Sequence, residues 1–258
     1  MTSDGTEQLQ QEPQSPMEGE TTAESEITST DSYNPQPQWW ETNSLLPFHP
    51  CSSMCIAGCT GSGKTHWVLR LLKHLPGMYQ DSPPQSVMYC YGVYQPLFDD
   101  MEKEVPNLTF HQGLPTRENI EDFTQDGQHH LLILDDLMSE VAASKTVQDL
   151  FCQFCHHRNV SVIYITQNIF QQGKCARSIA LNTYYLVLMR ALRAASQISH
   201  LGRQLYPGNG SMLEEVYRDC TQEPYSYLVI DLAPQSEDKY RQHTHIFPDK
   251  DPIVYVPK

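Results

Sequence analysis

The stretch that decides the fold is Gly58-Cys59-Thr60-Gly61-Ser62-Gly63-Lys64-Thr65, which matches the pattern G-x-x-x-x-G-K-[ST] at every fixed position. In this pattern the glycines let backbone N–H groups turn toward phosphate oxygens. Lys64 reaches the terminal phosphates, and the Thr65 hydroxyl is placed for a magnesium ion. The pattern arises by chance in roughly one chain in a hundred of this length. The alternative interpretation is a glycine-rich turn before a helix, so the flanking sequence must decide.

Both flanks favour the phosphate-binding interpretation. Residues 54–57 are a short apolar run that ends at the loop, which predicts a strand. Residues 64–75 then carry apolar side chains at helical spacing, and we expect Pro76-Gly77 to end that helix. A loop that follows a strand and opens a helix offers an anion both free N–H groups and the positive end of the helix dipole. The sequence therefore predicts a cradle for a nucleoside triphosphate.

A second buried strand is predicted at residues 130–134, and two carboxylates, Asp135 and Asp136, follow it directly. Its continuous apolar run is typical of a strand buried on both faces. Taken alone the run is ambiguous, because many buried parallel strands end in a polar residue. With the phosphate loop upstream, we interpret Asp135 as a magnesium ligand and Asp136 as the group that orients or deprotonates a water molecule.

A third apolar strand is predicted at residues 160–166, followed by Gln167 and Asn168. If this strand lies between the loop strand and the Asp135 strand, Gln167 faces the terminal phosphate and senses the nucleotide state. The alternative is that Gln167 makes ordinary turn hydrogen bonds. Three strands that each end in polar residues indicate a parallel sheet whose carboxyl ends share one crevice.

Strand and helix patterns alternate through the rest of the chain, and there is no internal repeat. The alternation predicts one α/β domain at residues 46–258, a mostly parallel sheet flanked by helices. Further strands are expected at 86–91, 108–111, 183–189 and, as the terminal strand, 225–232; further helices are expected at 97–104, from Thr116, from Ser144 to about His157, at 193–205 and at 211–219.

Residues 1–45 differ from the rest of the 258-residue chain in composition. They are rich in Gln, Ser, Thr, Glu and Pro and contain no Lys or Arg, which predicts a disordered acidic tail. Nine acidic residues of this tail account for most of the net charge of −14, and 22 acidic against 17 basic residues remain from Cys51 onward. Trp39-Trp40 is either a docking motif or an aromatic cover for the edge of the folded domain.

The chain shows neither a signal peptide nor an apolar run long enough to cross a bilayer, so we expect a soluble intracellular protein. Its eight cysteines are spread through strand- and helix-like segments, which indicates reduced thiols. Cys152-x-x-Cys155, with His156 and His157 after it, has the spacing of half a zinc site. No second pair completes the site, so core or helix-face cysteines are the favoured interpretation.

No acidic residue lies between Asp149 and Glu214, whereas six basic residues do. They form either a basic surface suited to a nucleic-acid backbone read without sequence preference, or a scattered solvated face. Arg158 has a second interpretation, as an arginine finger that enters the nucleotide site of a neighbouring subunit. The basic residues of the interval are Arg158, Lys174, Arg177, Arg190, Arg193 and Arg203.

The loop, the Asp135-Asp136 strand and the Gln167 strand together resemble the FtsK–HerA superfamily of DNA-pumping ATPases. The closer resemblance is to the poxvirus-type genome-packaging ATPases, in the form carried by Polinton (Maverick) elements and related DNA viruses. It extends from about Leu46 to the C-terminus. The stretches that carry it are Cys90-Tyr91-Gly92-Val93-Tyr94-Gln95-Pro96-Leu97, Leu134-Asp135-Asp136-Leu137-Met138, His156-His157-Arg158-Asn159-Val160-Ser161-Val162-Ile163, Ile165-Thr166-Gln167-Asn168, Ser196-Gln197-Ile198-Ser199-His200-Leu201 and Ile246-Phe247-Pro248.

The resemblance implies a RecA/FtsK–HerA-like P-loop fold, a homo-oligomeric ring, and ATP and Mg²⁺ as cofactors. It further implies hydrolysis of ATP that drives double-stranded DNA into a preformed capsid, with capsid proteins as partners, in the host nucleus or at a viral assembly site. The loop residues 58–65, Asp135 and Gln167 carry over directly. The superfamily usually has Glu after the magnesium Asp, and this chain has Asp136, one methylene shorter; Glu140 is a weaker candidate for the same role.

Three other classes of protein are alternatives to a DNA-packaging ATPase. A P-loop GTPase needs a guanine-reading N-K-x-D, which this sequence lacks, and a small-molecule kinase needs an acceptor pocket that no residue pattern marks. A non-enzymatic scaffold for DNA or capsid would keep nucleotide as a structural ligand. Such a scaffold is expected to bind ATP tightly and to release no phosphate.

Overall fold

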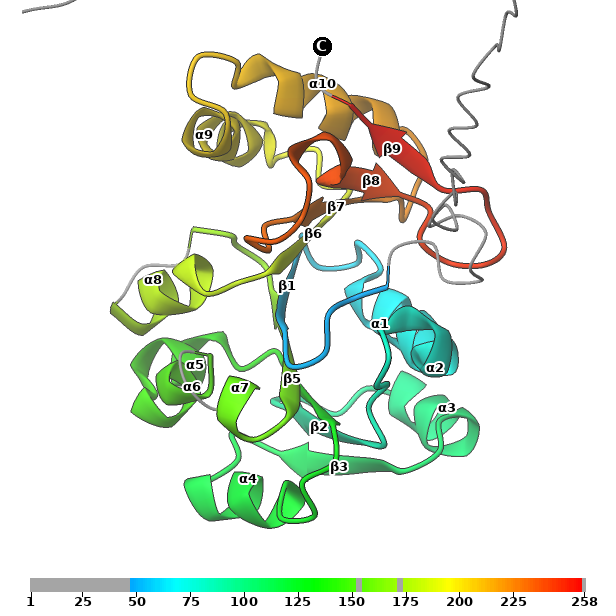
Figure 1. The fold of residues 1–258 in the computed structure, drawn as a ribbon, viewed down its shortest axis with the longest axis vertical. Coiled ribbons are helices and arrows are strands. Elements are labelled where there is room, and N and C mark those ends of the chain that lie inside the picture. The colour runs from blue at the N-terminus through cyan, green and yellow to red at the C-terminus, as the bar shows by residue number, and fades with distance from the viewer. Residues whose placement is uncertain (1–46, 152–154, 171–173, 257–258) are drawn as a thin grey trace, which may run out of the picture. The chain divides into compact units, whose positions relative to one another are not determined.

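The computed structural model of the chain describes residues 47–151, 155–170 and 174–256 (Figure 1). The tail expected at residues 1–45 and the Trp39-Trp40 pair lie outside these ranges. Among the described residues, no helix combines the length and the apolarity needed to span a membrane.

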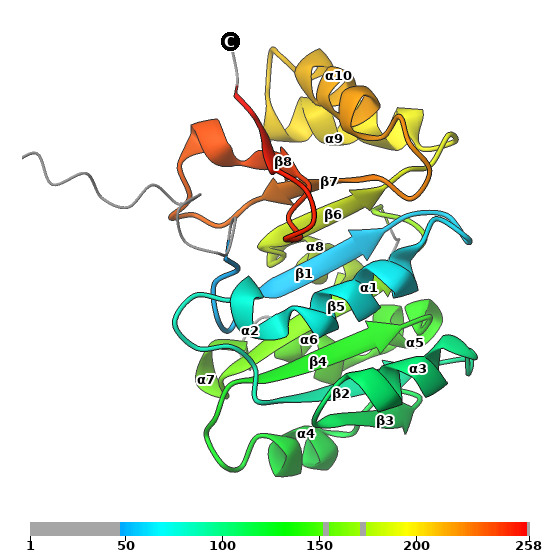
Figure 2. The same cartoon turned by 90° about the vertical axis from the view of Figure 1, so that its right-hand side faces the viewer.

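The described strands form one sheet in the order β3-β2-β4-β5-β1-β6-β7-β8-β9 (Figures 1 and 2). Pairing is parallel from β3 to β6 and antiparallel from β6 to β9. The predicted mostly parallel α/β sheet is therefore confirmed. The strands are β1 (Ser53–Ala57), β2 (Ser86–Tyr91), β3 (Leu108–Gln112), β4 (His130–Asp135), β5 (Val160–Thr166), β6 (Tyr185–Met189), β7 (Tyr227–Asp231), β8 (Gln242–Thr244) and β9 (Ile253–Tyr255).

Helices cover both faces of the sheet, and alternate residues of the inner strands supply the two cores. In β4, Leu131 and Ile133 belong to the core cluster that includes residues of α1 to α3, whereas Leu132 and Leu134 belong to the cluster that includes residues of α4 to α10. Figure 2 shows α1, α2 and α3 on one side of the strands. The helices are α1 (Lys64–Lys73), α2 (Leu75–Met78), α3 (Leu97–Glu104), α4 (Arg117–Phe123), α5 (Met138–Ala143), α6 (Lys145–Asp149), α7 (Cys155–His157), α8 (Lys174–Leu181), α9 (Ala195–Leu205) and α10 (Ser211–Cys220).

Several helix ends follow the predicted caps. The Thr116 side chain accepts from Asn119 N and forms a capping box at the start of α4. Ser144 caps α6 by accepting from Val147 N at 3.3 Å. The helix predicted from Ser144 to His157 contains α6 and α7, and residues 152–154 between them lie outside the described ranges.

Two predicted element ends are wrong. Pro76-Gly77 does not end the first helix: α1 ends at Lys73, and Pro76 lies in the first turn of α2, where its missing N–H is not needed. The strand predicted at 225–232 is not terminal, because β8 and β9 follow β7 at the edge of the sheet. Both added strands have three residues, too few to show a periodic pattern.

Candidate nucleotide site

The carboxyl ends of β1, β5 and β4 meet at one edge of the sheet. These strands are adjacent and parallel, with Ala57 opposite Thr166 and Ile165 opposite Asp135. The first residues after the three strands therefore emerge side by side. Because β5 lies between β1 and β4, the strand order on which the prediction for Gln167 depended is met. That Gln167 faces the terminal phosphate stays a prediction.

The backbone of the loop at 58–65 needs its glycines. Gly61 and Gly63 have φ of 78° and 93°, in the left-handed region that other residues enter only at a cost. A Cβ on Gly58 would lie 2.6 Å from Ser62 Oγ, so a side chain there would displace the loop. The loop leads into α1 through a hydrogen bond from Trp67 N to Gly63 O at 2.8 Å.

The polar groups of the loop fit a phosphate. Ser62 Oγ is buried and has no hydrogen-bond partner among the described residues, and a buried polar atom of this kind normally has a partner. Lys64 Nζ donates to Gly58 O at 2.7 Å and to Cys59 O at 3.0 Å, which holds an ammonium group within the loop. Burial lowers the pKa of Lys64, while the negative charge of Asp135 opposes that shift.

The first carboxylate, Asp135, is buried and hydrogen-bonded. Its side chain is 4% exposed, and Tyr89 Oη donates to its Oδ2 at 2.7 Å. Burial raises the pKa of Asp135, and the hydrogen bond from Tyr89 opposes that shift. Tyr89 lies on β2 and was not singled out in the sequence, because only the pairing of β2 with β4 brings it to Asp135.

The second carboxylate, Asp136, is exposed and follows β4 in a strained backbone conformation. Its φ is 55°, in the left-handed region, and such strain in a residue other than glycine is concentrated at functional sites. Gly92 N donates to Asp135 O at 3.0 Å. A Cβ on Gly92 would lie 2.5 Å from Asp136 O, so the loop after β2 approaches the Asp136 backbone closely. Glu140, the weaker candidate, lies on α5 and accepts from Ser139 Oγ at 2.7 Å.

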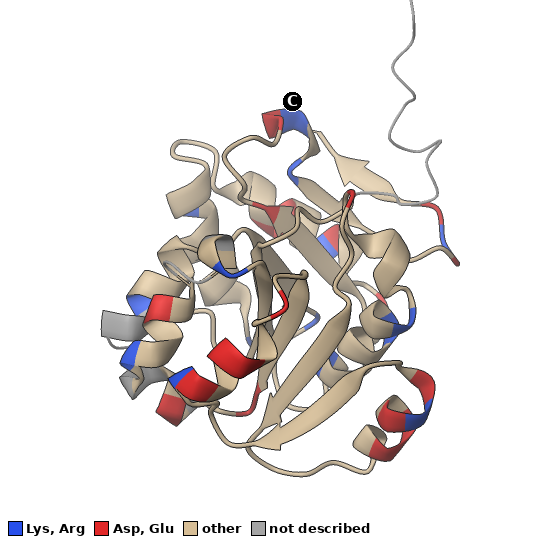
Figure 3. Cartoon of the chain, turned by 60° about the horizontal axis from the view of Figure 1, so that its bottom comes forward, with Lys and Arg blue, Asp and Glu red and all other residues tan. Residues whose placement is uncertain are grey.

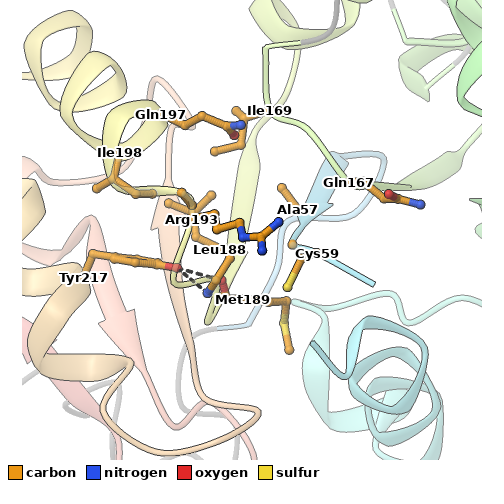
Figure 4. Close-up of a pocket in the computed structure, with 13 residues that line it drawn as sticks. Ala57, Cys59, Gln167, Ile169, Leu188, Met189, Arg193, Gln197, Ile198 and Tyr217 are labelled. Atoms are coloured by element: carbon orange, nitrogen blue, oxygen red, sulfur yellow. Dashed lines mark hydrogen bonds between the residues drawn. The ribbon is translucent and has the colours of Figure 1, made fainter. Parts of the chain in front are cut away.

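A small cavity of about 100 Å³ joins the start of the loop to Gln167 and Arg193 (Figure 4). Figure 4 shows the Arg193 side chain extending from the β6–α9 connection toward Ala57 and Cys59. Tyr217 Oη accepts from Ala191 N and donates to Met189 O, both at 2.9 Å, which holds this connection in place. Arg193 was predicted only as part of the basic interval, and Tyr217 was not among the predicted site residues.

Arg158 is not brought to this edge within the chain. It precedes β5, whereas Gln167 follows it, and a seven-residue strand at about 3.3 Å per residue spans about 23 Å. The Arg158 guanidinium pairs with Glu121 Oε1 at 3.2 Å. The structure therefore unites the loop, Asp135, Asp136 and Gln167, and leaves Arg158 at the opposite end of β5.

The described basic residues of the acid-free interval do not form one surface. Arg190 and Arg193 follow β6 at the edge that carries the loop, whereas Arg158 lies at the other edge. Figure 3 shows Lys and Arg residues scattered over several elements. The first turn of α3 carries Asp99 and Asp100.

The candidate half zinc site lies partly outside the described residues. Cys155 is buried and its thiol donates to Leu150 O at 3.1 Å, as expected of a core cysteine, whereas Cys152 lies outside the described residues. Within the described part of the chain, no three His, Cys, Asp or Glu residues are grouped so as to hold a metal ion.

The sheet order, the loop between β1 and α1 and the carboxylate pair after β4 define a P-loop nucleotide-binding fold. The chain belongs to the poxvirus A32 protein family, whose family model matches residues 41–188. The predicted resemblance to the poxvirus-type genome-packaging ATPases is thereby confirmed, while the Polinton form of that family stays a prediction.

Solved structures of two viral proteins are similar to this chain. One is B204, the DNA-packaging ATPase from Sulfolobus turreted icosahedral virus, at 14% identity and a TM-score of 0.49, covering 73% of this chain and 96% of B204. Another is the genome packaging NTPase B204 from Sulfolobus turreted icosahedral virus 2 in complex with ATP-gammaS, at 13% identity and a TM-score of 0.44, covering 72% and 94%. A search of curated proteins gives no match.

Proposed function

We propose that this protein is a magnesium-dependent ATPase that moves double-stranded DNA into a viral or transposon capsid. One observation carries the proposal: a glycine loop with a buried, unpartnered Ser62 hydroxyl and a held Lys64 ammonium lies at the same sheet edge as Asp135 and Asp136. Membership of the poxvirus A32 family supports the viral role.

In this proposal the loop binds the triphosphate. Its backbone N–H groups and Ser62 Oγ donate to phosphate oxygens, and Lys64 moves from its loop carbonyls onto the terminal phosphates. Thr65 and Asp135 hold Mg²⁺, a hard cation that prefers oxygen ligands. An ion held by these two residues would neutralise part of the negative charge of the phosphates.

The remaining polar groups act on the terminal phosphate. Asp136 is exposed beside Asp135, as a group that must orient or deprotonate water has to be. Gln167 senses the nucleotide state. Arg193 lines the cavity at Gly58 and Cys59 and supplies a positive charge on the same side. Arg158 enters the site of a neighbouring subunit, and its position at the opposite end of β5 from Gln167 supports a role in trans.

The wider assembly belongs to the same proposal. The protein forms a homo-oligomeric ring around duplex DNA, contacts the DNA backbone without sequence preference, and engages capsid proteins at a viral assembly site or in the host nucleus. The alternative is a scaffold that binds nucleotide for structural reasons. The scaffold is retained as the alternative because Asp136, the residue assigned to water activation, is one methylene shorter than the Glu that is usual at this position.

The catalytic part is tested by comparing Lys64→Ala with Lys73→Ala. Lys73 lies on the same helix and pairs with Glu104, outside the loop. We expect Lys64→Ala to lower phosphate release at least about 100-fold, the cost of removing one preorganised charged donor, and Lys73→Ala to leave it unchanged. If Lys64→Ala hydrolysed ATP at the wild-type rate, the assignment would be wrong.

Two further measurements separate the motor from the scaffold. In a single-turnover assay, the wild-type protein is expected to release phosphate, whereas a scaffold would bind ATP and release none. Added duplex DNA is expected to bind at low salt, to dissociate as salt rises and to increase turnover. If the protein released phosphate but duplex DNA neither bound nor increased turnover, the ATPase assignment would stand and the proposed DNA movement would be refuted.

A further inference from the structure

Tyr225 is an exposed aromatic residue held in an unusual backbone conformation next to the candidate site. It lies in the turn before β7, its side chain is 69% exposed, and its φ is 62°. A left-handed φ is a genuine outlier for a bulky residue. The turn is fixed by a hydrogen bond from Arg190 N to Ser226 O at 2.9 Å, which ties it to the end of β6.

The Tyr225 ring lies against the last glycine of the phosphate loop. A Cβ on Gly63 would lie 3.0 Å from Tyr225 Cδ1 and 3.6 Å from Cγ. The absence of a side chain at position 63 therefore leaves room for the ring. Gly63 caps the first turn of α1. The ring therefore adjoins the loop at the point where the loop enters the helix.

The ring lies on the opposite side of the loop from the carboxylates. In the sheet, β5 and β4 flank β1 on one side and carry Gln167 and Asp135, whereas β6 and β7 flank it on the other side. Tyr225 directly precedes the paired end of β7. A triphosphate whose terminal phosphate points toward Asp135 and Asp136 thus extends its remaining part toward Tyr225.

A cavity of about 380 Å³ opens beside the ring, within the size range of small-molecule sites. Arg70 of α1 forms one wall, and its guanidinium lies 4.4 Å from the centre of the Phe247 ring and pairs with Asp249. These contacts hold the segment after β8 against α1. Aromatic, basic and acidic residues line the cavity, among them Tyr225, Phe247, Arg70, Lys250, Glu223 and Asp249.

We infer that Tyr225 is the stacking platform for the base of the bound nucleotide, with the adjoining cavity receiving the base. The inference rests on the proposed nucleotide function and deepens it by naming the base subsite. Every nucleobase has a π-face, so stacking on a tyrosine gives affinity with little choice between bases. Tyr225 therefore strengthens binding of ATP and GTP alike, and contributes nothing to binding of inorganic triphosphate.

The experiment measures dissociation constants of ATP, GTP and inorganic triphosphate for the full chain by calorimetry. We expect Tyr225→Ala to weaken ATP and GTP binding about 5- to 150-fold, the range for loss of one base–aromatic stack, with triphosphate binding unchanged. Tyr225→Phe should retain wild-type affinity. Tyr225→Gly suits the left-handed backbone, so it removes the ring while relieving the constraint on the turn.

Tyr94 provides a matched control, because it is another exposed tyrosine, in the loop between β2 and α3. Tyr94→Ala should leave all three affinities unchanged. Equal ATP affinity in wild type and Tyr225→Gly would overturn the base subsite. An equal loss of ATP and triphosphate binding would also overturn it, and would assign the ring to packing of the loop. If the wild-type protein bound none of the three ligands, the proposed nucleotide function itself would be overturned.

Discussion

Gly92 is expected to be indispensable because it lies against the backbone of Asp136, the carboxylate that we propose activates water. It is in the loop after β2, and its N–H donates to Asp135 O at 3.0 Å. In Gly92→Ala the new Cβ would lie 2.5 Å from Asp136 O, about 0.9 Å short of the 3.4 Å at which ordinary contact begins. Both atoms belong to backbone-fixed positions, so no side-chain rotation can relieve the clash.

The clash has two expected consequences. Overpacking of this kind costs about 1–3 kcal/mol of unfolding free energy, or roughly 2–12 °C in Tm for a domain of this size. Movement of the Asp136 backbone by about 1 Å is expected to lower kcat about 100-fold. Nucleotide affinity should change little, because the loop at 58–65 follows β1, whereas Gly92 and Asp136 follow β2 and β4. The phosphate loop therefore keeps its own contacts.

The assay pairs thermal unfolding by circular dichroism with steady-state ATP hydrolysis. Gly77→Ala is the matched control: Gly77 is exposed in α2, and a Cβ there would meet nothing within 4 Å. The control should keep the wild-type kcat and have a Tm no lower than that of the wild type, because Ala is favoured over Gly in a helix. A Gly92→Ala protein with both values unchanged would refute the close approach between the two loops.

Three further predictions concern the charged groups. Because burial raises the pKa of Asp135, its ionised form is destabilised by folding, and stability falls as pH rises through that raised pKa. Asp135→Asn is therefore expected to add about 0.5–2 kcal/mol of stability at neutral pH while abolishing Mg²⁺-dependent hydrolysis; an unchanged or lower Tm would contradict this. Tyr89→Phe removes the hydrogen bond that lowers the pKa of Asp135. The acid limb of the pH profile of kcat/KM should therefore move to higher pH. An unmoved limb would exclude Asp135 as the group that must be ionised for hydrolysis. Arg158→Ala breaks a half-exposed ion pair worth about 0–1 kcal/mol, so its Tm should change little. If Arg158 acts in trans, mixing the inactive Arg158→Ala and Lys64→Ala proteins should restore hydrolysis, and a mixture that stays inactive would count against the trans role.

Much of the site was predictable because each of its parts has a recognisable local sequence pattern. The loop at 58–65 is a fixed pattern, and the strands that end at Asp135 and before Gln167 are continuous apolar runs. The order of these strands in the sheet could not be read from the sequence and was only assumed for the prediction about Gln167. The parallel pairing of β5 with both β1 and β4 confirms that order.

The errors have equally local causes. A proline and glycine pair reads as a helix stop, yet Pro76 is accommodated in the first turn of α2, where a proline is favoured. The strands β8 and β9 are too short to be recognised from sequence. They form because β7 offers β8 an edge to pair with, and β8 in turn offers one to β9.

The sequence by itself determined the phosphate loop, the buried strands and the two carboxylates, since each depends on neighbouring residues and on periods of two or 3.6. Only the tertiary structure decided which side chains join them. Tyr89 reaches Asp135 through the pairing of β2 with β4, Arg193 reaches the loop from the end of β6, and Tyr225 reaches Gly63 from the turn before β7. These contacts depend on strand order, which pairs residues far apart in the chain and leaves no local pattern to detect.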